Sequence, residues 1–166
     1  MLQGAMLNND AVLRPVAGEW TLHGDPTEGA LAALSLKAGH TREDLELRFP
    51  RVAEIPFSAE QRFMATSHAD RADGGIIYVK GAPERLLEMC RLQLDDAGQE
   101  QPLATEYWRQ SIGTLANNGE RVLALAYKHL GAPSAGRAPQ DIETGLCFVG
   151  LFGITDRPRQ EAAPAI

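Results

Sequence analysis

The sequence predicts an α+β fold, in which a mostly antiparallel sheet is flanked by helices. Three observations lead to this prediction. Apolar and polar residues alternate with a period of two in the middle of the chain, helical patterns flank this region, and two strongly apolar segments lie near the end. The length of 166 residues suits one globular domain.

The first third of the chain predicts mainly helices. Asp25 suits a helix cap, and Pro26 suits the first turn because its missing N–H would have no partner there. Thr41 is a second candidate cap, and the residues before Gly24 are weakly patterned. The elements expected here are a helical turn over 1–7, a short strand over 20–23, and helices over 26–37 and 42–47.

The pattern then changes to that of a strand, since Ala53, Ile55 and Phe57 would share one face. Short polar turns separate this strand from the next apolar runs, so an antiparallel meander is expected. Pro83 suits the first turn of a helix, which we expect to include Cys90. The expected elements are strands over 51–57, 62–67 and 76–79, a helix from 83, a helix over 103–116, and central strands covered by helices over 121–127 and 145–154.

The charge balance excludes two classes of partner. The chain has 16 Lys and Arg against 22 Asp and Glu, so it lacks the basic surface expected for binding nucleic acid or an anionic membrane. No apolar run is long enough for a membrane span, and no secretory signal is present. Cys90 and Cys147 are expected to be buried free thiols. We therefore expect a soluble cytosolic domain that is not inserted in the membrane.

Motifs of common catalytic sites are absent from the sequence. There is no G-x-x-x-x-G-K-[ST] phosphate loop, no G-x-G-x-x-G after a strand, no G-x-S-x-G elbow and no H-E-x-x-H. The four histidines, at 23, 40, 68 and 129, lack metal-ligand spacing, so no metal site is expected. Periodicity and composition alone therefore lead no further than an α+β domain.

Five segments, taken together, resemble one known family. They are G-D-P-T-E-G-A-L at 24–31, I-P-F-S-A-E-Q-R-F-M at 55–64, V-K-G-A-P-E at 79–84, G-E-R-V-L-A-L-A at 119–126 and G-L-F-G-I-T-D-R-P-R at 150–159. In this order and at these separations they resemble the nucleotide-binding (N) domain of P-type cation-transporting ATPases, of a bacterial calcium-pump type. The resemblance implies an N domain over 1–159, with 160–166 beginning the return to the phosphorylation domain.

The resemblance implies that Phe57 stacks on the adenine of ATP and that Glu28 contacts the adenine amine. On the residues alone, Phe57 suits either an open cleft or an ordinary core position, and the core position is favoured. Asp25-x-x-Glu28 has the spacing of a capping pair, in which Glu28 accepts a backbone N–H. Sequence alone favours the cap, although both roles for Glu28 are compatible.

The cationic residues of the implied site are Lys80, Arg121 and Arg62. Lys80 ends a strand before Gly81, a residue that permits close backbone approach to a ligand. The resemblance implies that Lys80 lies in the pocket, with Gly81 and Ala82 as its backbone wall. It also implies that Arg121 reaches the phosphates, although a surface ion pair with a neighbouring acid fits the sequence equally well. Arg62 matches a position usually held by Lys and is the second candidate beside the phosphates.

The sequence departs from the family pattern at two places. Ala59 and Gln61-Arg62 stand where relatives commonly have a second Ser and an Arg-Lys pair, so one positive charge near the phosphates is lost. Arg157 stands in place of the first Pro of the family's D-P-P-R hinge, which bears on the stiffness of that hinge.

The catalytic segments of the family do not occur in these 166 residues. Neither the D-K-T-G-T that carries the phosphorylated Asp nor the G-D-G-x-N-D of the Mg²⁺ site is present. The resemblance therefore implies a piece of a multi-pass membrane pump, on the cytoplasmic side of the plasma membrane, that binds ATP and is inactive by itself. Mg²⁺ is expected only with the absent phosphorylation domain, and the expected partners are the phosphorylation and actuator domains of the parent chain.

Two other functions remain open. One is a non-catalytic interaction module with an N-like fold and a decayed nucleotide pocket, which Ala59, Gln61 and the acidic balance favour. The other is an independent small-molecule hydrolase that uses acids such as Glu28 and Asp156, which lacks a convincing pair of nucleophile and base.

Overall fold

The computed structural model describes residues 1–70, 74–130 and 142–155. Its elements, in chain order, are α1 (Leu2–Leu7), β1 (Val12–Val16), β2 (Glu19–His23), α2 (Pro26–Lys37), α3 (Arg42–Arg48), β3 (Arg51–Ile55), β4 (Phe63–Asp70), β5 (Gly74–Gly81), α4 (Pro83–Met89), β6 (Cys90–Leu94), β7 (Glu100–Pro102), α5 (Thr105–Asn117), β8 (Arg121–Leu130) and β9 (Leu146–Ile154).

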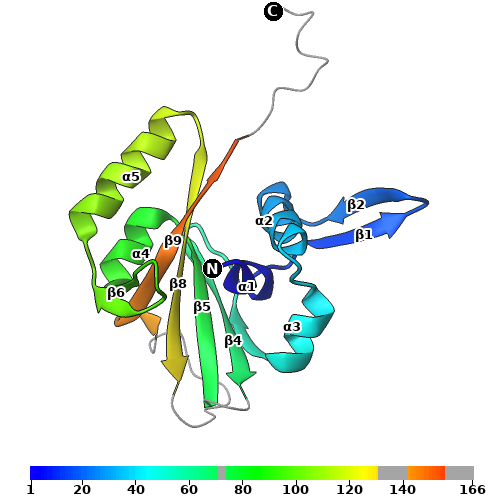
Figure 1. Ribbon diagram of the computed structural model, residues 1–166, viewed down its shortest axis with the longest axis horizontal. Helices are drawn as coiled ribbons and strands as arrows, with labels where there is room; N and C mark the ends of the chain where they lie inside the picture. The colour runs from blue at the N-terminus through cyan, green and yellow to red at the C-terminus, as the bar shows by residue number, and fades with distance from the viewer. Residues whose placement is uncertain (71–73, 131–141, 156–166) are drawn as a thin grey trace, which may run out of the picture.

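Seven strands form the main sheet, in the order β3-β4-β5-β8-β9-β6-β7 (Figure 1). All neighbouring pairs are antiparallel except β6 and β9, which are parallel. The predicted α+β fold with a mostly antiparallel sheet flanked by helices is confirmed. The two apolar segments near the end of the chain are the central strands β8 and β9, as their composition predicts.

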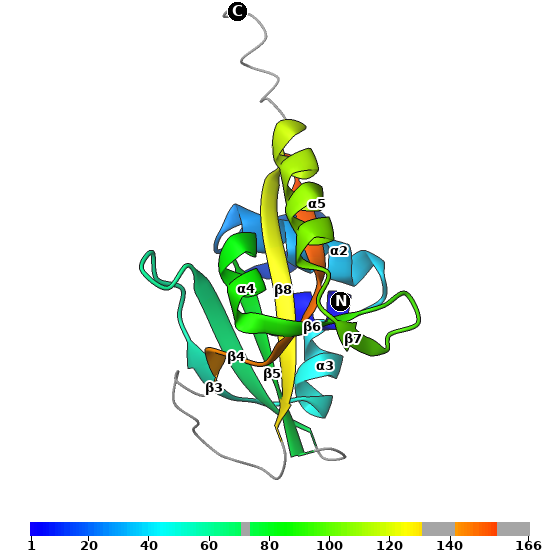
Figure 2. The same ribbon diagram turned by 90° about the vertical axis from the view of Figure 1, so that its left-hand side faces the viewer.

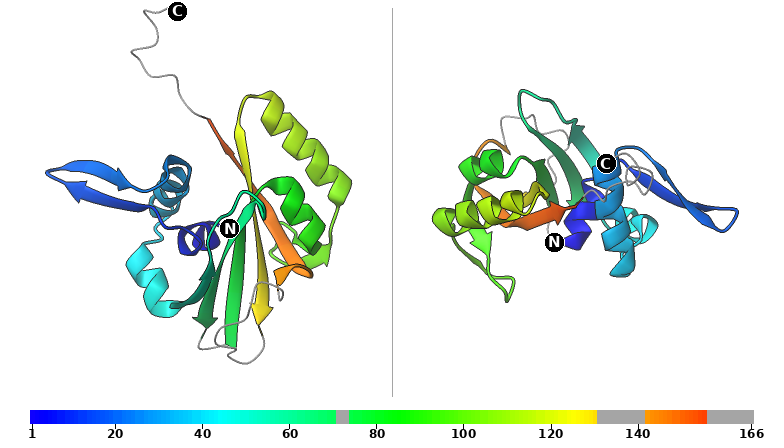
Figure 3. Two further views of the ribbon diagram at one scale, coloured as in Figure 1. Left: turned by 180° about the vertical axis from the view of Figure 1, so that it is seen from behind. Right: turned by 90° about the horizontal axis from the view of Figure 1, so that it is seen from above.

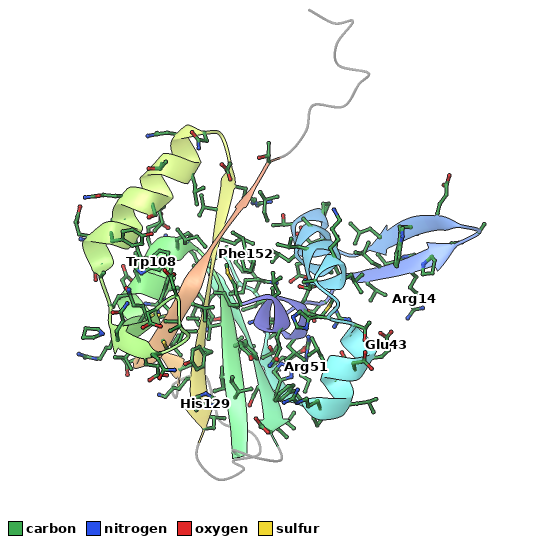
Figure 4. All side chains as sticks on the ribbon, in the orientation of Figure 1. Arg14, Glu43, Arg51, Trp108, His129 and Phe152 are labelled. Atoms are coloured by element: carbon green, nitrogen blue, oxygen red, sulfur yellow. The ribbon has the colours of Figure 1, made fainter. Side chains whose placement is uncertain are left out.

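Helices cover both faces of the central strands (Figures 1 and 2). Because side chains alternate along a strand, Ile77 and Val79 of β5 pack with α4, whereas Ile76 and Tyr78 pack with α1, α2 and α3. The side chain of Trp108 belongs to the α5 side of the sheet, where its ring lies 4.7 Å from that of Phe148 between centroids (Figure 4). The molecule therefore has two apolar cores, one on each side of the sheet.

The helix caps that the sequence predicts are present. Asp25 Oδ1 accepts hydrogen bonds from the backbone N–H of Thr27 (2.8 Å) and of Glu28 (3.2 Å), and Thr41 caps α3 through the N–H of Asp44. Since these caps fix where α2 and α3 begin, they also fix the residues that α2 directs toward the end of the sheet.

Three strands were not expected from the sequence. Cys90 begins strand β6 rather than lying in the preceding helix, which ends at Met89, because β6 pairs in parallel with β9. The short strand β7 then pairs with β6. Strand β1 joins β2 in a separate hairpin that extends away from the main sheet (Figures 1 and 3). The sequence of β1 shows no alternation of apolar and polar residues that would predict a strand.

Both cysteines are buried and free, as predicted. No helix in the described part of the chain is both long and apolar enough to cross a membrane. The predicted D-R-P-R hinge at 156–159, the boundary at 160 and the acid Asp156 of the hydrolase alternative lie outside the described residues.

Candidate functional site

Five segments of the chain meet at one end of the main sheet. Strand β4 begins there, β5 ends there and β8 begins there, since the pairing places Phe63 opposite Gly81 and Gly81 opposite Ala124. The first turn of α2 and the connection between β3 and β4 complete a cavity of about 740 Å³. Among the residues lining this cavity are all seven of the predicted site residues: Glu28, Phe57, Arg62, Lys80, Gly81, Ala82 and Arg121.

Phe57 forms an open apolar part of the cavity wall. It lies two residues beyond the end of β3, and its side chain is 63% exposed. The core position that sequence alone favours for this ring is therefore wrong. An exposed aromatic face on a cavity wall is available to stack on a flat ligand.

Lys80 and Glu28, in contrast to Phe57, form a largely buried ion pair. Lys80 Nζ donates to Glu28 Oε1 over 2.8 Å, and the side chains are 5% and 16% exposed. Lys80 Nζ also donates to the backbone carbonyl of Asn8 over 2.7 Å. Burial lowers the pKa of the Lys80 ammonium, and the charge of Glu28 opposes this shift.

Glu28 does not act as the reciprocal member of a capping pair. Its Oε1 accepts from Lys80, and its Oε2 accepts from the backbone N–H of Asp10 over 3.0 Å. The carboxylate thus turns away from the cap of α2, toward the chain that follows α1. Asp25 alone supplies the side-chain cap, so the capping function expected of Glu28 is corrected.

Gly81 is required by the chain itself. A Cβ at this position would overlap the carbonyl oxygen of Arg62 and would lie 2.7 Å from the Cα of Phe63. Close approach of the Arg62 and Phe63 backbone is therefore one reason for a glycine at this position.

Arg62 and Arg121 lie on the solvent-exposed part of the cavity wall. Arg62 adopts a left-handed backbone conformation with φ of 59°, and its carbonyl accepts from the N–H of Ala82 over 2.9 Å. Arg121 Nη1 donates to Thr27 Oγ1 over 2.9 Å. Within the described residues it forms no salt bridge, so the surface ion pair that the sequence left open is absent there.

Asp25 carries a negative charge beside Arg121. Burial by itself would raise the pKa of the Asp25 carboxyl, but hydrogen bonds from Glu28 and Thr27 and the charge of Arg121 hold it below its usual value. The N-terminal turn of α2 therefore holds an ionised acid next to the guanidinium that faces the cavity.

Several residues of the site were not among those predicted from the sequence. Asp10 and Thr27 line the cavity, and Ile112 of α5 adds an apolar wall. Asn8 lies behind the cavity and contacts Lys80. For Asn8 and Asp10 the sequence signal is a run of small polar residues, N-N-D at 8–10, directly after an apolar helix, which is also the pattern of an ordinary turn.

The arrangement suits an organic anion with a flat ring. It offers an exposed aromatic face, a carboxylate held by two donors and two exposed guanidinium groups, within the size range of small-molecule pockets. Within the described residues, no group of three or more His, Cys, Asp or Glu side chains could hold a metal ion.

Comparison with known proteins gives a consistent result. The family model described as "P-type ATPase, cytoplasmic domain N" matches residues 1–161. The chain is 42% identical over 161 residues to "Cation-transporting ATPase pma1" of Synechocystis sp., which covers 97% of this chain and 18% of that protein. It is 36% identical over 171 residues to "Probable cation-transporting ATPase F" of Mycobacterium tuberculosis, covering 100% of this chain and 18% of that protein.

A third relative is "Calcium-transporting ATPase" of Bacillus subtilis, which is 32% identical over 173 residues, covering 100% of this chain and 19% of that protein. The chain thus spans less than a fifth of the length of these three relatives. The match extends over the segments that form the cavity as well as the strands that support them. The chain belongs to the family of P-type ATPase cytoplasmic N domains.

Proposed function

We propose that this chain binds ATP in the cavity at the end of the sheet. The observation that carries the proposal is the 63% exposed ring of Phe57 on the wall of a cavity that is also lined by five acidic side chains, Glu28 among them, and by the basic side chains of Arg62, Lys80 and Arg121. An adenine nucleotide presents a flat ring, an exocyclic amine and a polyanionic tail, and each finds a chemical counterpart there.

The base end of the nucleotide would be held by Phe57 and Glu28. Stacking of a base on an aromatic side chain stabilises binding by about 1–3 kcal/mol. Both oxygens of Glu28 already accept one hydrogen bond, from Lys80 and from Asp10, but each carboxylate oxygen has a second lone pair. An adenine amine can therefore add to Glu28 without breaking its ion pair.

The phosphates would extend toward Arg121 and Arg62. Arg121 donates to Thr27 in the free protein, and phosphate oxygens would replace or join this neutral acceptor. Lys80, with Gly81 and Ala82, would form the adjoining wall. With one stacked ring and a few partly exposed polar contacts, we expect a dissociation constant of about 0.05–1 mM.

In the parent protein this domain would hold ATP by its base and present the γ-phosphate to an Asp of a neighbouring domain. Phosphoryl transfer depends mainly on positioning and charge neutralisation, so these tasks can be divided between domains. The proposal includes an N domain over 1–159, the start of the return segment over 160–166, Mg²⁺ bound with the phosphorylation domain, and contacts with the phosphorylation and actuator domains. It also includes a cation-transporting membrane protein whose N domain faces the cytoplasm, and no catalysis by this chain alone.

The test is a titration of the chain with ATP, followed by backbone amide chemical shifts. Shifts that cluster at Glu28, Phe57, Lys80 and Gly81 support the proposal. If saturating ATP moves none of these signals, the proposal fails, and the interaction module with a decayed pocket becomes the better description. Turnover of a phosphate ester by the pure chain with added metal would instead support the hydrolase.

A further inference from the structure

The segment Asn8–Asp10 joins the C-terminal end of α1 to the cavity, and nothing in the proposed ATP contacts uses it. Asn8 is fully buried, and its backbone carbonyl accepts from Lys80 Nζ over 2.7 Å. The backbone N–H of Asp10 donates to Glu28 Oε2 over 3.0 Å. This segment therefore contacts both members of the Lys80–Glu28 pair through main-chain atoms, which side-chain patterns do not reveal.

The side chain of Asn8 fixes this segment to the sheet. Its Nδ2 donates to the carbonyl of Tyr78 over 2.7 Å and to that of Met64 over 3.3 Å. Tyr78 and Lys80 lie two residues apart on β5, so the same amide that anchors Asn8 also sets the distance from its carbonyl to Lys80. Within the described part of the chain, Oδ1 of Asn8 is buried without a hydrogen-bond partner.

A buried acceptor without a hydrogen-bond partner destabilises a fold, because its hydration is lost and not replaced. A residue that served packing alone would avoid this cost. The amide of Asn8 is therefore explained by its hydrogen bonds to β4 and β5 and by the contact of its backbone carbonyl with Lys80.

The opposite side of the segment is held by two arginines. Arg51 donates through Nη2 to the carbonyls of Leu7 (2.9 Å) and Asn9 (3.0 Å), and Arg42 Nη1 donates to the carbonyl of Asn9 over 3.0 Å. Figure 4 shows Arg51 on the side of the sheet that carries α1 and α3. Held from both sides, the segment cannot shift without breaking several hydrogen bonds at once.

We propose that Asn8 is a positioning residue of the nucleotide site, which holds the Lys80 ammonium and, through Asp10, the Glu28 carboxylate in the orientation that receives the ligand. The proposal rests on the proposed ATP binding and deepens it. Asn8 itself does not line the cavity, so it would act without touching the nucleotide. Its effect on binding passes through Lys80 and Glu28.

The test compares Asn8→Ala with Gln93→Ala in the 166-residue chain. Gln93 is a matched control, since it is a buried amide that makes two hydrogen bonds, from Ala104 N and Trp108 Nε1, and does not line the cavity. Asn8→Ala should weaken ATP binding about fivefold, as expected for one lost anchoring hydrogen bond. Gln93→Ala should lower the melting temperature while leaving the ATP affinity unchanged.

The second readout is the ammonium signal of Lys80 in ¹⁵N-labelled protein. The chain has three lysines, at 37, 80 and 128, and the exposed Lys37 serves as an internal reference. In the unsubstituted 166-residue chain the ammonium protons of Lys80 should exchange slowly with water. Asn8→Ala should speed this exchange and move the signal. Gln93→Ala should do neither.

Two outcomes overturn the proposal. One is a folded Asn8→Ala variant with the parent's ATP affinity and the parent's Lys80 signal. The other is fast exchange of the Lys80 ammonium protons in the unsubstituted 166-residue chain, and slow exchange there supports the proposal. This measurement decides the question if the Asn8→Ala variant does not fold. If the parent does not bind ATP, the proposed function fails alone, because the Lys80 signal still reports whether Asn8 positions the ammonium.

Discussion

The two sides of the cavity differ in how they are held. On the buried side, Lys80 and Glu28 are 5% and 16% exposed and are paired with each other and with main-chain atoms of 8–10. On the exposed side, Phe57 is 63% exposed, and Arg62 and Arg121 also reach solvent. The buried side is fixed before any ligand arrives, whereas the exposed side can adjust to one. We therefore expect stability and affinity to be coupled on the buried side and separable on the exposed side.

The largest effect is expected from Lys80→Met. This change leaves the Glu28 carboxylate largely buried without its counter-ion, which costs about 3–5 kcal/mol in well-buried pairs. Urea denaturation should show a loss of unfolding free energy near the lower end of that range, together with weaker ATP binding. Adding Glu28→Gln should restore part of the stability, because the unpaired charge is then removed.

The matched control for this pair is Arg85→Met. Arg85 and Glu88 form a pair of similar chemistry whose side chains are 29% and 63% exposed, so its loss should cost less than about 1 kcal/mol. If Lys80→Met were no more destabilising than Arg85→Met, the buried side would not be held as described.

The second effect concerns pH and a histidine buried in the core. His68 is 1% exposed, and burial, with a contribution from the charge of Arg51, lowers its pKa from 6.5 to about 4, although its hydrogen bond to the Phe49 carbonyl opposes this shift. The folded state therefore favours neutral His68. Stability from this group is complete above pH 6.5 and is lost as the pH falls from 6.5 toward 4, by at most about 3 kcal/mol.

The check on His68 is the unfolding free energy of parent and variant between pH 7.5 and 4. His68→Gln should flatten the pH dependence of the unfolding free energy in that window relative to the unmodified chain. Parallel curves for parent and His68→Gln would contradict the assignment.

The third effect is on affinity alone. Phe57→Ala should weaken ATP binding about tenfold, within the range for loss of one base–aromatic stack. Its melting temperature should stay close to that of the parent, because the ring buries little area in the free protein. Tyr107→Ala is the control, since Tyr107 is 62% exposed and does not line the cavity, and this change should leave ATP binding unchanged. Equal ATP affinity for Phe57→Ala and the parent would remove the stacking assignment.

The smallest effect is expected from Arg121→Gln. An exposed cation contributes modestly, so ATP binding should weaken about two- to fivefold at low salt and less in 0.5 M salt, where charges are screened. Arg109→Gln, an exposed arginine outside the cavity, removes the same charge and should leave the affinity nearly unchanged. An effect of Arg121→Gln that does not depend on salt would indicate a shape change rather than a charge contact.

Local patterns in the sequence predicted much of the fold. The caps Asp25 and Thr41 fixed the starts of α2 and α3, and the apolar composition of β8 and β9 indicated their central place. Strand β6 could not be predicted, because Cys90 leaves the helical pattern only when β9, more than 50 residues later, pairs beside it. Pairing over such separations leaves no local signal.

The site shows the same difference between what local patterns predict and what long-range contacts decide. Its seven residues could be named because ordered motifs resemble a known family, and all seven line one cavity. The capping role of Glu28 was misread from its neighbours in sequence, since its carboxylate accepts from Lys80 and Asp10 rather than completing the cap.

The sequence by itself determined most of the elements, though not β1, β6 and β7, together with the family resemblance and the residue types that a nucleotide requires, because these depend on short-range pattern. Only the tertiary structure decided that Phe57 lies open while Lys80 is buried against Glu28 and Asn8. Exposure and partner choice depend on which segments, 18 to 72 residues apart, are brought together at the end of the sheet. The hydrogen bonds that make this arrangement run largely through main-chain atoms, which are the same in every residue and therefore leave no mark in the sequence.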